Sequence, residues 1–489
     1  MSRYAGIVVR VLVVAALAGC GADRASERKL ALTECRLPKL ALAAQCGTLT
    51  VPEDRRKPAG RTIALEVAVL PANTLNPKPD PLFILAGGPG QAASHLGPLA
   101  SQLVGVRKDR DLVLVDQRGA GRSSPLECAA FKPDDSIEAA LELDPKPKAA
   151  QCARELAAKG IDAAQYTTAA FVADLEAMRD ALGYARINLW GGSYGTRVAL
   201  EYVRRHADRV RSVVLDSVAP PSMRVSLDVW PTRDAALNAV IDACSATPSC
   251  ASAHSDVGAT LARLREALGT GRRVTLADPR TGEPRELTLT FEHVIGALQP
   301  LTYAPELAAL MPEVIERAAG GDFGPLYATA SLVSGELVAQ MNAGLHYSVT
   351  CAEDVPRVTP ADVEALANVR ARELARRLLA VCDVWPHGDA PADARAPVQS
   401  DVPVLLLSGG LDPVTPPSYA AEVARTLSHS RHIVARGYGH IVTPHACGPR
   451  LVAAFVDDPS FATLPTSCVD YFEHSARTPL WPDRLAPQP

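Results

Sequence analysis

The fold is decided by the stretch INLWGGSYG at residues 187–195. Its first four residues read as a strand, and a helix-like run from Thr196 to about Arg205 follows. A strand, the pattern G-x-S-x-G and a helix together form a nucleophile elbow. The outer glycines let strand and helix pack closely, and the sharp turn between them exposes the serine hydroxyl at the edge of a sheet. We therefore predict that Ser193 is a catalytic nucleophile.

Further apolar runs on both sides of this stretch predict more buried strands. They lie at 82–85, 112–115, 213–215, 404–407 and 432–434. Two antiparallel strands are expected before them, at 47–52 and 62–69, and a helix from Thr167 or Thr168 to Gly183. Continuous apolar strands that alternate with helices indicate an α/β fold with a mostly parallel sheet and helices on both faces.

The alternation of strands and helices is interrupted over residues 222–398. This segment is mainly helical in pattern and rich in alanine and arginine, with strand-like signal only near 273–276 and 287–289. We interpret it as an inserted cap domain carried on loops at the carboxyl ends of the strands. The two parts of the core are then expected at 35–221 and 399–489.

The N-terminus has the pattern of an export signal. Two arginines precede a short apolar run that ends in Leu-Ala-Gly-Cys at residues 17–20, which is similar to the processing box of bacterial lipoproteins. The similarity implies a signal peptide at 1–19, lipidation of Cys20 and a tether at 20–34, with the outer membrane favoured because Gly21 is not Asp. An ordinary secretory signal with an incidental cysteine is the alternative. No later apolar run is long enough to predict a membrane-spanning helix.

Cysteine usage also favours export. Removing Cys20 from the 11 cysteines leaves an even number, which suits a set of disulfides in an oxidising compartment. Pairing nearest neighbours would join Cys35 to Cys46, Cys128 to Cys152, Cys244 to Cys250, Cys351 to Cys382 and Cys447 to Cys468, although the sequence leaves the connectivity open. No C-x-x-C or H-E-x-x-H spacing occurs, so no metal site is expected.

The charge balance argues against nucleic acid as a partner. The formal net charge is -4, and short basic pairs such as Arg204-Arg205 are expected to be solvated. With 489 residues the chain is long enough for a large core and an additional domain.

A serine nucleophile needs a base to accept its proton and a carboxylate to orient that base. Asp412 and His440 each follow a predicted strand. Both then lie at the same sheet edge as Ser193, in the order serine, acid, histidine that one group of serine hydrolases uses. We predict these three residues as the catalytic triad, with His445 as the alternative base. Asp216 also follows a strand but comes early for the acid position, so we interpret it as structural.

Acyl transfer also requires donors for the developing oxyanion, each worth about 3–4 kcal/mol. The backbone N–H of Tyr194, the residue after the nucleophile, is one expected donor. The other should come from a loop after an early strand, where the sequence reads GGPG at residues 87–90. Because Pro89 has no N–H, we predict Gly88, with Gly87 as the less favoured alternative.

These motifs resemble the prolyl and tripeptidyl aminopeptidase branch of the α/β-hydrolases, over nearly all of the mature length. The similar stretches are GGPG at 87–90, DQRGAGRS at 116–123, the elbow with Tyr194, DPVTP at 412–416, and Gly439-His440. Ala86 stands where prolyl aminopeptidases typically carry histidine, which favours the tripeptidyl type. The cysteines at 351, 382 and 447 also look like that subgroup.

The resemblance implies an aminopeptidase with an α/β-hydrolase fold, a mainly helical cap and no cofactor. Such an enzyme binds peptide substrates by their free α-ammonium, which requires a carboxylate in a partly desolvated pocket. Glu353 matches the usual position of that acid, and Asp354 is the alternative; both acids being solvated at the surface is the competing interpretation. Asp116 and Arg118 are expected to form a structural ion pair near the site.

The sequence therefore favours an exported, lipid-anchored serine aminopeptidase that releases short N-terminal fragments, of tripeptidyl or prolyl type, through an acyl-enzyme. An exported esterase with the same triad is the alternative, because the fold alone does not separate esters from amides. A non-catalytic envelope lipoprotein on a hydrolase scaffold is the third hypothesis.

Overall fold

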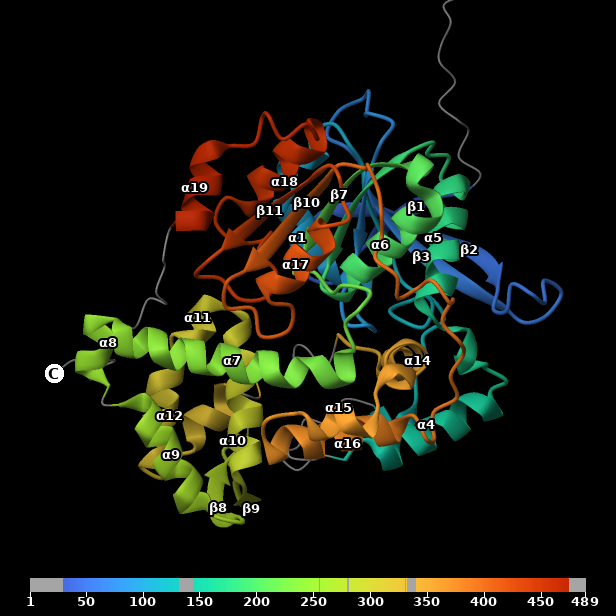
Figure 1. Cartoon of the computed structure of the whole chain (residues 1–489). Coiled ribbons are helices and arrows are strands. Elements are labelled where there is room, and N and C mark those ends of the chain that lie inside the picture. Colours follow the sequence, from blue (N-terminus) through green and yellow to red (C-terminus); the bar gives the residue numbers. More distant parts are fainter. Residues whose placement is uncertain are drawn as a thin grey trace, which may run out of the picture.

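The structure is a computed structural model that describes residues 30–131, 144–254, 256–278, 281–329, 331 and 340–474. The predicted signal peptide and Cys20 lie outside these residues. Figure 1 shows a sheet with its flanking helices in the upper part of the view and a second group of helices below it. The second group contains helices of the segment predicted as the cap together with α4 (Lys146–Ala158).

A mostly parallel sheet forms the centre of the core, as predicted. Within the described residues, nine strands form it in the order β1-β2-β3-β5-β4-β6-β7-β10-β11. All neighbours from β5 to β11 are parallel, whereas β1, β2 and β3 are antiparallel at one edge. The strands are β1 Thr33–Arg36, β2 Ala43–Pro52, β3 Thr62–Leu70, β4 Leu82–Leu85, β5 Leu112–Val115, β6 Ile187–Gly192, β7 Val210–Asp216, β10 Val404–Gly409 and β11 Ser430–Ala435.

The central strands are apolar throughout because both of their faces are covered. Every residue of β4, β5, β6 and β10 is buried. Alternate side chains of a strand point to opposite faces, so Phe83 and Leu85 join one buried cluster while Leu82 and Ile84 join the other. The first cluster includes α5 (Thr168–Ala181) and α6 (Tyr194–His206); the second includes α1 (Gly97–Gln102), α18 (Gly448–Asp457) and α19 (Thr466–His474).

The helix predicted before the elbow is α5. Its N-cap is Thr167, whose hydroxyl accepts a hydrogen bond from the backbone N–H of Ala170 at 3.2 Å. Gly183 follows the end of the helix with a φ of 78°, a conformation that favours glycine.

The chain enters the sheet earlier than predicted. Thr33 pairs with Cys46 and Glu34 with Gln45, so β1 begins within the segment that we assigned to the tether. The polar composition of this segment hid the strand, because β1 lies at the sheet edge and is mostly exposed.

The predicted cap contains two separate clusters of buried side chains. The larger cluster joins the second half of α7 (Val225–Ala246) to α8 (Pro248–Ala253), α9 (Val257–Leu268), α10 (Phe291–Leu298), α11 (Pro305–Ala308), α12 (Met311–Ala319) and the hairpin of β8 (Arg272–Ala277) and β9 (Pro284–Leu289). This hairpin coincides with the predicted strand-like signal. The smaller cluster joins the start of α7 to α15 (Pro360–Glu364) and α16 (Val369–Val381).

One helix of the insertion is built into the core. Leu345 and Val349 of α14 (Ala343–Glu353) belong to the same buried cluster as α5 and α6. Conversely, α4 (Lys146–Ala158), which precedes the insertion, packs beside α16 (Figure 1). Across the described ranges, every helix is too short or too polar to cross a lipid bilayer.

Five disulfides link the described cysteines, in the pairs that nearest neighbours give. They join Cys35 to Cys46, Cys128 to Cys152, Cys244 to Cys250, Cys351 to Cys382 and Cys447 to Cys468. The fourth ties α14 to the residue that follows α16.

Candidate active site

Ser193 occupies the sharp turn between β6 and α6. Its φ of 55° and ψ of -124° lie in a region that non-glycine residues rarely adopt. A Cβ atom at Gly191 would come within 2.4 Å of the carbonyl oxygen of Gly195, and one at Gly195 within 2.2 Å of that of Leu85. Both outer glycines are therefore required for the helix to approach the strands this closely.

Asp412 and His440 form a hydrogen-bonded pair beyond the carboxyl ends of β10 and β11. The Nδ1 atom of His440 lies 3.0 and 2.9 Å from the two carboxylate oxygens of Asp412. Because a carboxylate only accepts hydrogen bonds, Nδ1 carries the proton and Nε2 is left as the basic nitrogen. His445, the alternative base, instead packs its ring on Tyr438 at 5.3 Å between centroids.

Asp412 is held ionised although it is completely buried. Burial alone would raise the pKa of its carboxyl group, but the electrostatic interaction and hydrogen bond with His440 and the backbone N–H groups of Thr415 and Val414 outweigh burial and hold that pKa below its usual value. The hydroxyl of Thr415 donates a further hydrogen bond to Oδ2 at 2.9 Å. The role of Thr415 was not predicted, although an aspartate followed by backbone and hydroxyl donors is a recognisable turn motif.

Asp216 connects the nucleophile to the histidine loop. Its backbone carbonyl accepts the N–H of Ser193 at 2.9 Å, and its carboxylate accepts the N–H groups of Val442 and Thr443 at 2.8 and 2.7 Å. These contacts agree with the structural role that the sequence indicated.

The elbow and the histidine loop are in direct contact. A Cβ atom at Gly192 would lie 3.1 Å from the side chain of Ile441, the residue after the histidine. The hydroxyl of Ser193 forms no hydrogen bond within the described part of the chain, so the structure does not close the bond between Ser193 and His440. Hydrogen bonds in unliganded active sites are often long and tighten when substrate binds.

The glycine-rich loop after β4 lies over the elbow. A Cβ atom at Gly87 would be 3.1 Å from that of Ser193. The N–H of Gly87 donates to Oε1 of Gln91 at 3.3 Å, whereas the N–H groups of Gly88 and Tyr194 have no partner among the described residues. The loop thus leaves free the two N–H groups that the sequence assigned to the oxyanion.

Glu353 and Asp354 are buried and do not lie at the surface. Glu353 is 9% exposed and accepts hydrogen bonds from the backbone N–H and the hydroxyl of Thr168, at 2.7 and 2.8 Å. That hydroxyl lies 2.7 Å from the phenol oxygen of Tyr194. Burial raises the pKa of Glu353, although the charge of Arg197 opposes this shift.

The two acids differ in the ion pairs that they form within the protein. Asp354 is completely buried and forms ion pairs with Arg197 at 2.9 Å and with Arg357 at 2.8 Å. Glu353 lies 3.9 Å from Arg197 and lines a small cavity together with Thr168 and Pro391. Neither carboxylate contacts Ser193 or His440 within the described residues.

The predicted ion pair between Asp116 and Arg118 is wrong. Arg118 binds both carboxylate oxygens of Asp174 on α5, at 2.6 and 2.7 Å. Asp116 accepts hydrogen bonds from the N–H and hydroxyl of Ser94 and from the N–H of Arg122. Each side chain finds a closer buried partner on a different segment, which sequence proximity does not reveal.

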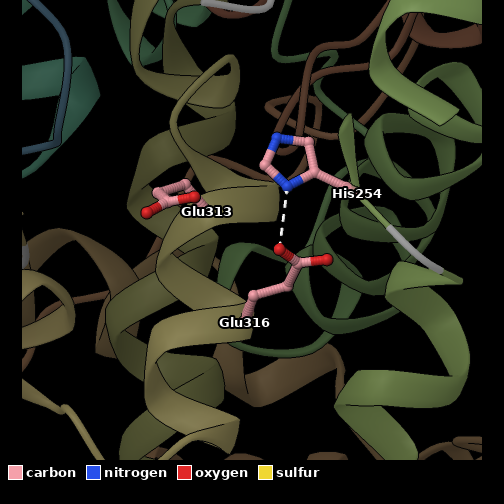
Figure 2. Close-up of side chains that lie close together, drawn as sticks. All are labelled: His254, Glu313 and Glu316. Carbon is pink, nitrogen blue, oxygen red and sulfur yellow. Dashed lines mark hydrogen bonds and ion pairs between the residues drawn. The ribbon is translucent and has the colours of Figure 1, made fainter. Parts of the chain in front are cut away.

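A group of possible metal ligands lies in the cap. The ligand atoms of His254, Glu313 and Glu316 are within 4.8 Å of one another (Figure 2). His254 Nδ1 contacts Glu316 at 3.0 Å, as Figure 2 shows, and Glu313 pairs with Arg317 at 2.9 Å. Each acid therefore already has a partner: the contact of His254 with Glu316 holds α12 to the end of α8, and the pair of Glu313 and Arg317 lies within α12.

An α/β core that presents a strained elbow serine beside a buried Asp–His pair defines the class: a serine hydrolase of the α/β-hydrolase fold. Two family models match the chain, one described as alpha/beta hydrolase fold over residues 80–293 and one described as TAP-like protein over residues 367–468. The second covers the segment that holds Asp412 and His440. The two matches together support a TAP-like α/β-hydrolase.

Three relatives illustrate the range of this similarity. Serine protease Hip1 from Mycobacterium tuberculosis is 26% identical over 494 residues, covering 88% of this chain and 92% of the relative. Tripeptidyl aminopeptidase from Streptomyces coelicolor is 33% identical over 226 residues, covering 42% of this chain and 41% of the relative. Carboxylesterase B from Mycobacterium tuberculosis is 27% identical over 434 residues, covering 78% of each.

Proposed function

We propose that this protein is a serine aminopeptidase that releases short fragments from the free N-terminus of peptides. The observation that carries the proposal is the buried Asp412–His440 pair, packed against the loop that presents Ser193. The TAP-like match over the segment of Asp412 and His440 supports a peptidase, as do the relatives named serine protease and tripeptidyl aminopeptidase.

In the proposed mechanism, Ser193 Oγ attacks the scissile carbonyl while Nε2 of His440 accepts its proton. Asp412 holds the other ring nitrogen and stabilises the imidazolium that forms. The N–H groups of Gly88 and Tyr194 stabilise the oxyanion. His440 then protonates the leaving amine, and an acyl-enzyme remains on Ser193. Water, activated by His440, releases the N-terminal fragment.

Of the two predicted acids, Glu353 is the better candidate for the substrate ammonium. Asp354 is occupied by two arginines, whereas Glu353 borders a cavity and is linked through Thr168 to Tyr194, the residue beside the nucleophile. We propose that a free α-ammonium replaces part of the contact between Glu353 and Thr168.

The first test uses the soluble form that starts after Cys20 and a mixed peptide library read by mass spectrometry. We expect N-terminal fragments of uniform short length, and we expect Ser193→Ala to lower turnover by several orders of magnitude with the fold intact. Circular dichroism of the variant is the control for folding. Retained turnover in Ser193→Ala, or cleavage only at internal bonds, would contradict the proposal.

An esterase is the second candidate, because one relative is named Carboxylesterase B. The two functions are separated by comparing kcat/KM for a peptide p-nitroanilide with a free N-terminus, its N-acetylated form and a p-nitrophenyl ester. An aminopeptidase should lose most of its activity on N-acetylation, and Glu353→Gln should impair the free-amine substrate far more than the ester. Equal effects on both substrates would favour the esterase. A non-catalytic scaffold would fail to react with a fluorophosphonate probe.

We also propose that the protein is exported and anchored by a lipid on Cys20. The disulfides support an oxidising compartment. The test is expression of the full chain and of Cys20→Ser, followed by detergent phase partitioning. The wild type should enter the detergent phase and the variant the aqueous phase; equal partitioning would leave an ordinary secretory signal as the better interpretation.

A further inference from the structure

The oxyanion loop is held from outside by the segment that leads into α14. The N–H of Asn342 donates to the carbonyl oxygen of Gly90 at 2.9 Å, and Gln91 forms an antiparallel bridge with Met341. A Cβ atom at Gly90 would lie 2.6 Å from the backbone oxygen of Asn342. The loop and this segment are therefore in backbone contact, without room for an intervening side chain.

Gln91 extends this contact to the N–H groups of the loop. Its amide nitrogen donates to the side chain of Gln340 at 3.0 Å, and its amide oxygen accepts the N–H of Gly87 at 3.3 Å. Because the same amide group makes both bonds, Gln340 helps to orient the Gln91 amide whose oxygen accepts the N–H of Gly87. The N–H of Gly88 is the one that remains for the oxyanion.

His346, one turn into α14, holds the centre of the same loop. Its Nδ1 atom lies 3.2 Å from the carbonyl oxygen of Pro89. A carbonyl oxygen only accepts, so Nδ1 must carry the proton. Burial lowers the pKa of His346, which keeps the ring neutral and leaves it with a single N–H donor when Nδ1 is protonated.

The opposite end of α14 reaches the other expected oxyanion donor. Glu353, the last residue of the helix, binds Thr168, whose hydroxyl contacts the phenol of Tyr194. One rigid helix, anchored in the core through Leu345 and Val349, thus touches the structures that carry both donors. A helix of this kind fixes the distance between two loops that are remote in sequence.

We propose that His346 is a positioning residue for the oxyanion hole, because its bond to Pro89 fixes the direction of the Gly88 N–H. The inference rests on the proposed acyl-transfer function of Ser193. It assigns to α14 a part in catalysis that does not require contact with substrate. Misplacement of a catalytic group by about 1 Å typically costs up to about 100-fold in rate.

The experiment compares His346→Leu, which removes the donor, with His346→Gln, whose amide retains one. We expect His346→Leu to lower kcat about 10- to 100-fold with KM nearly unchanged, because the oxyanion forms only in the transition state. His346→Gln should restore most of the loss. The rate of fluorophosphonate labelling of Ser193, which needs no knowledge of the natural substrate, should follow the same order.

Two further variants make the result interpretable. His254→Leu removes a buried histidine that contacts Glu316 in the cap, and it should leave kcat unchanged. Gln340→Ala removes the acceptor of Gln91 and should reduce kcat by less than His346→Leu does. This second variant keeps the test valid if His346→Leu does not fold.

The outcomes separate the two proposals. If wild-type protein shows no turnover or labelling that depends on Ser193, the proposed function fails. If Ser193 is active and His346→Leu labels at the wild-type rate, the positioning role fails. It also fails if His346→Leu and His346→Gln lose equal activity, or if His254→Leu loses as much.

Discussion

Thr415 supports the acid of the candidate triad more directly than any other residue apart from His440. Both its backbone N–H and its hydroxyl donate to the carboxylate of Asp412, at 2.8 and 2.9 Å. A carboxylate buried without such donors would lose its charge. The orientation of His440 therefore depends on a threonine that does not itself belong to the triad.

Replacing Thr415 by valine keeps the shape of the side chain and removes the hydroxyl. A hydrogen bond to a charged group contributes about 1.5–3 kcal/mol, which corresponds to about 10- to 100-fold if it is lost in the transition state. We expect Thr415→Val to lower kcat within this range and to leave KM nearly unchanged, as measured with one p-nitroanilide substrate. Thr426→Val is the matched control, because that hydroxyl donates to the carbonyl of Val398 before β10. Equal kcat in wild type and Thr415→Val would show that the Thr415 hydroxyl does not support Asp412 in catalysis.

Glu353 gives a prediction about pH and stability. Its pKa is raised in the folded protein above the usual 4.5, so the fold favours the uncharged form. The carboxylate then costs stability above the folded pKa, and this cost disappears as the pH falls to 4.5 and below. Glu353→Gln can still bond both groups of Thr168, so its melting temperature should exceed that of the wild type at neutral pH, with the difference vanishing below pH 4.5.

The matched control for Glu353 is Glu201→Gln. Glu201 is also buried, but its carboxylate pairs with Arg204 and Arg205 at 2.9 and 2.7 Å. Its replacement should bring no gain at neutral pH. A melting temperature of Glu353→Gln below that of the wild type at neutral pH would mean that the carboxylate stabilises the fold.

At the scale of elements, the helices and strands that depend on a local sequence pattern could be predicted. The buried strands were predictable because continuous apolar runs ended in glycine or aspartate, and α5 because its N-cap and closing glycine flank an amphipathic run. The contacts that were not predicted join segments that are remote in the sequence and meet only in the fold. The partner of Arg118 lies 56 positions away on α5, and α14 packs into the core although it lies within the insertion.

Two glycine substitutions, one at the junction between β4 and α6 and one in α10, should have opposite effects. In Gly195→Ala the new Cβ would lie 2.2 Å from the carbonyl oxygen of Leu85, so α6 must move away from β4. We expect a loss of about 3 kcal/mol or more in unfolding free energy, together with loss of activity. Gly296 lies exposed inside α10 with open space around it, so Gly296→Ala should gain about 0.5–1 kcal/mol and keep full activity. Denaturant titration measures both, and a mild effect of Gly195→Ala would show that the elbow tolerates a wider spacing.

At the scale of the whole molecule, the described part of the cap contacts the candidate site through Tyr303 and through α14. The backbone carbonyl of Tyr303 accepts the N–H of His440 at 2.9 Å, and the ring of Tyr303 packs on the imidazole at 5.3 Å between centroids. The other contact is that of α14 with the oxyanion loop. The insertion thus forms part of the wall of the site, and the contacts of Tyr303 and His346 with it were not predicted because they join segments remote in sequence.

The disulfide between Cys351 and Cys382 anchors the helix that contacts the oxyanion loop, because Cys351 lies in α14 between His346 and Glu353. It closes a loop with a sequence separation of 31, whereas the bridge from Cys244 to Cys250 spans only 6. The loop-entropy model then gives about 3–4 kcal/mol for the first bridge and about 2 kcal/mol for the second. The double variant Cys351→Ala/Cys382→Ala should therefore lose more unfolding free energy than Cys244→Ala/Cys250→Ala.

The two double variants should also differ in catalysis. Only the loss of the bridge at Cys351 loosens the helix that touches the oxyanion loop, so only that variant should show a lower kcat at temperatures where both proteins remain folded. The bridge at Cys244 joins α7 to α8 within the larger cap cluster, which includes none of the described residues of the oxyanion loop. Calorimetry and kcat measured on the same preparations test both points. An equal loss of kcat in the two variants would show that the cap acts on the site through its overall stability, and α14 would then have no special part in holding the loop.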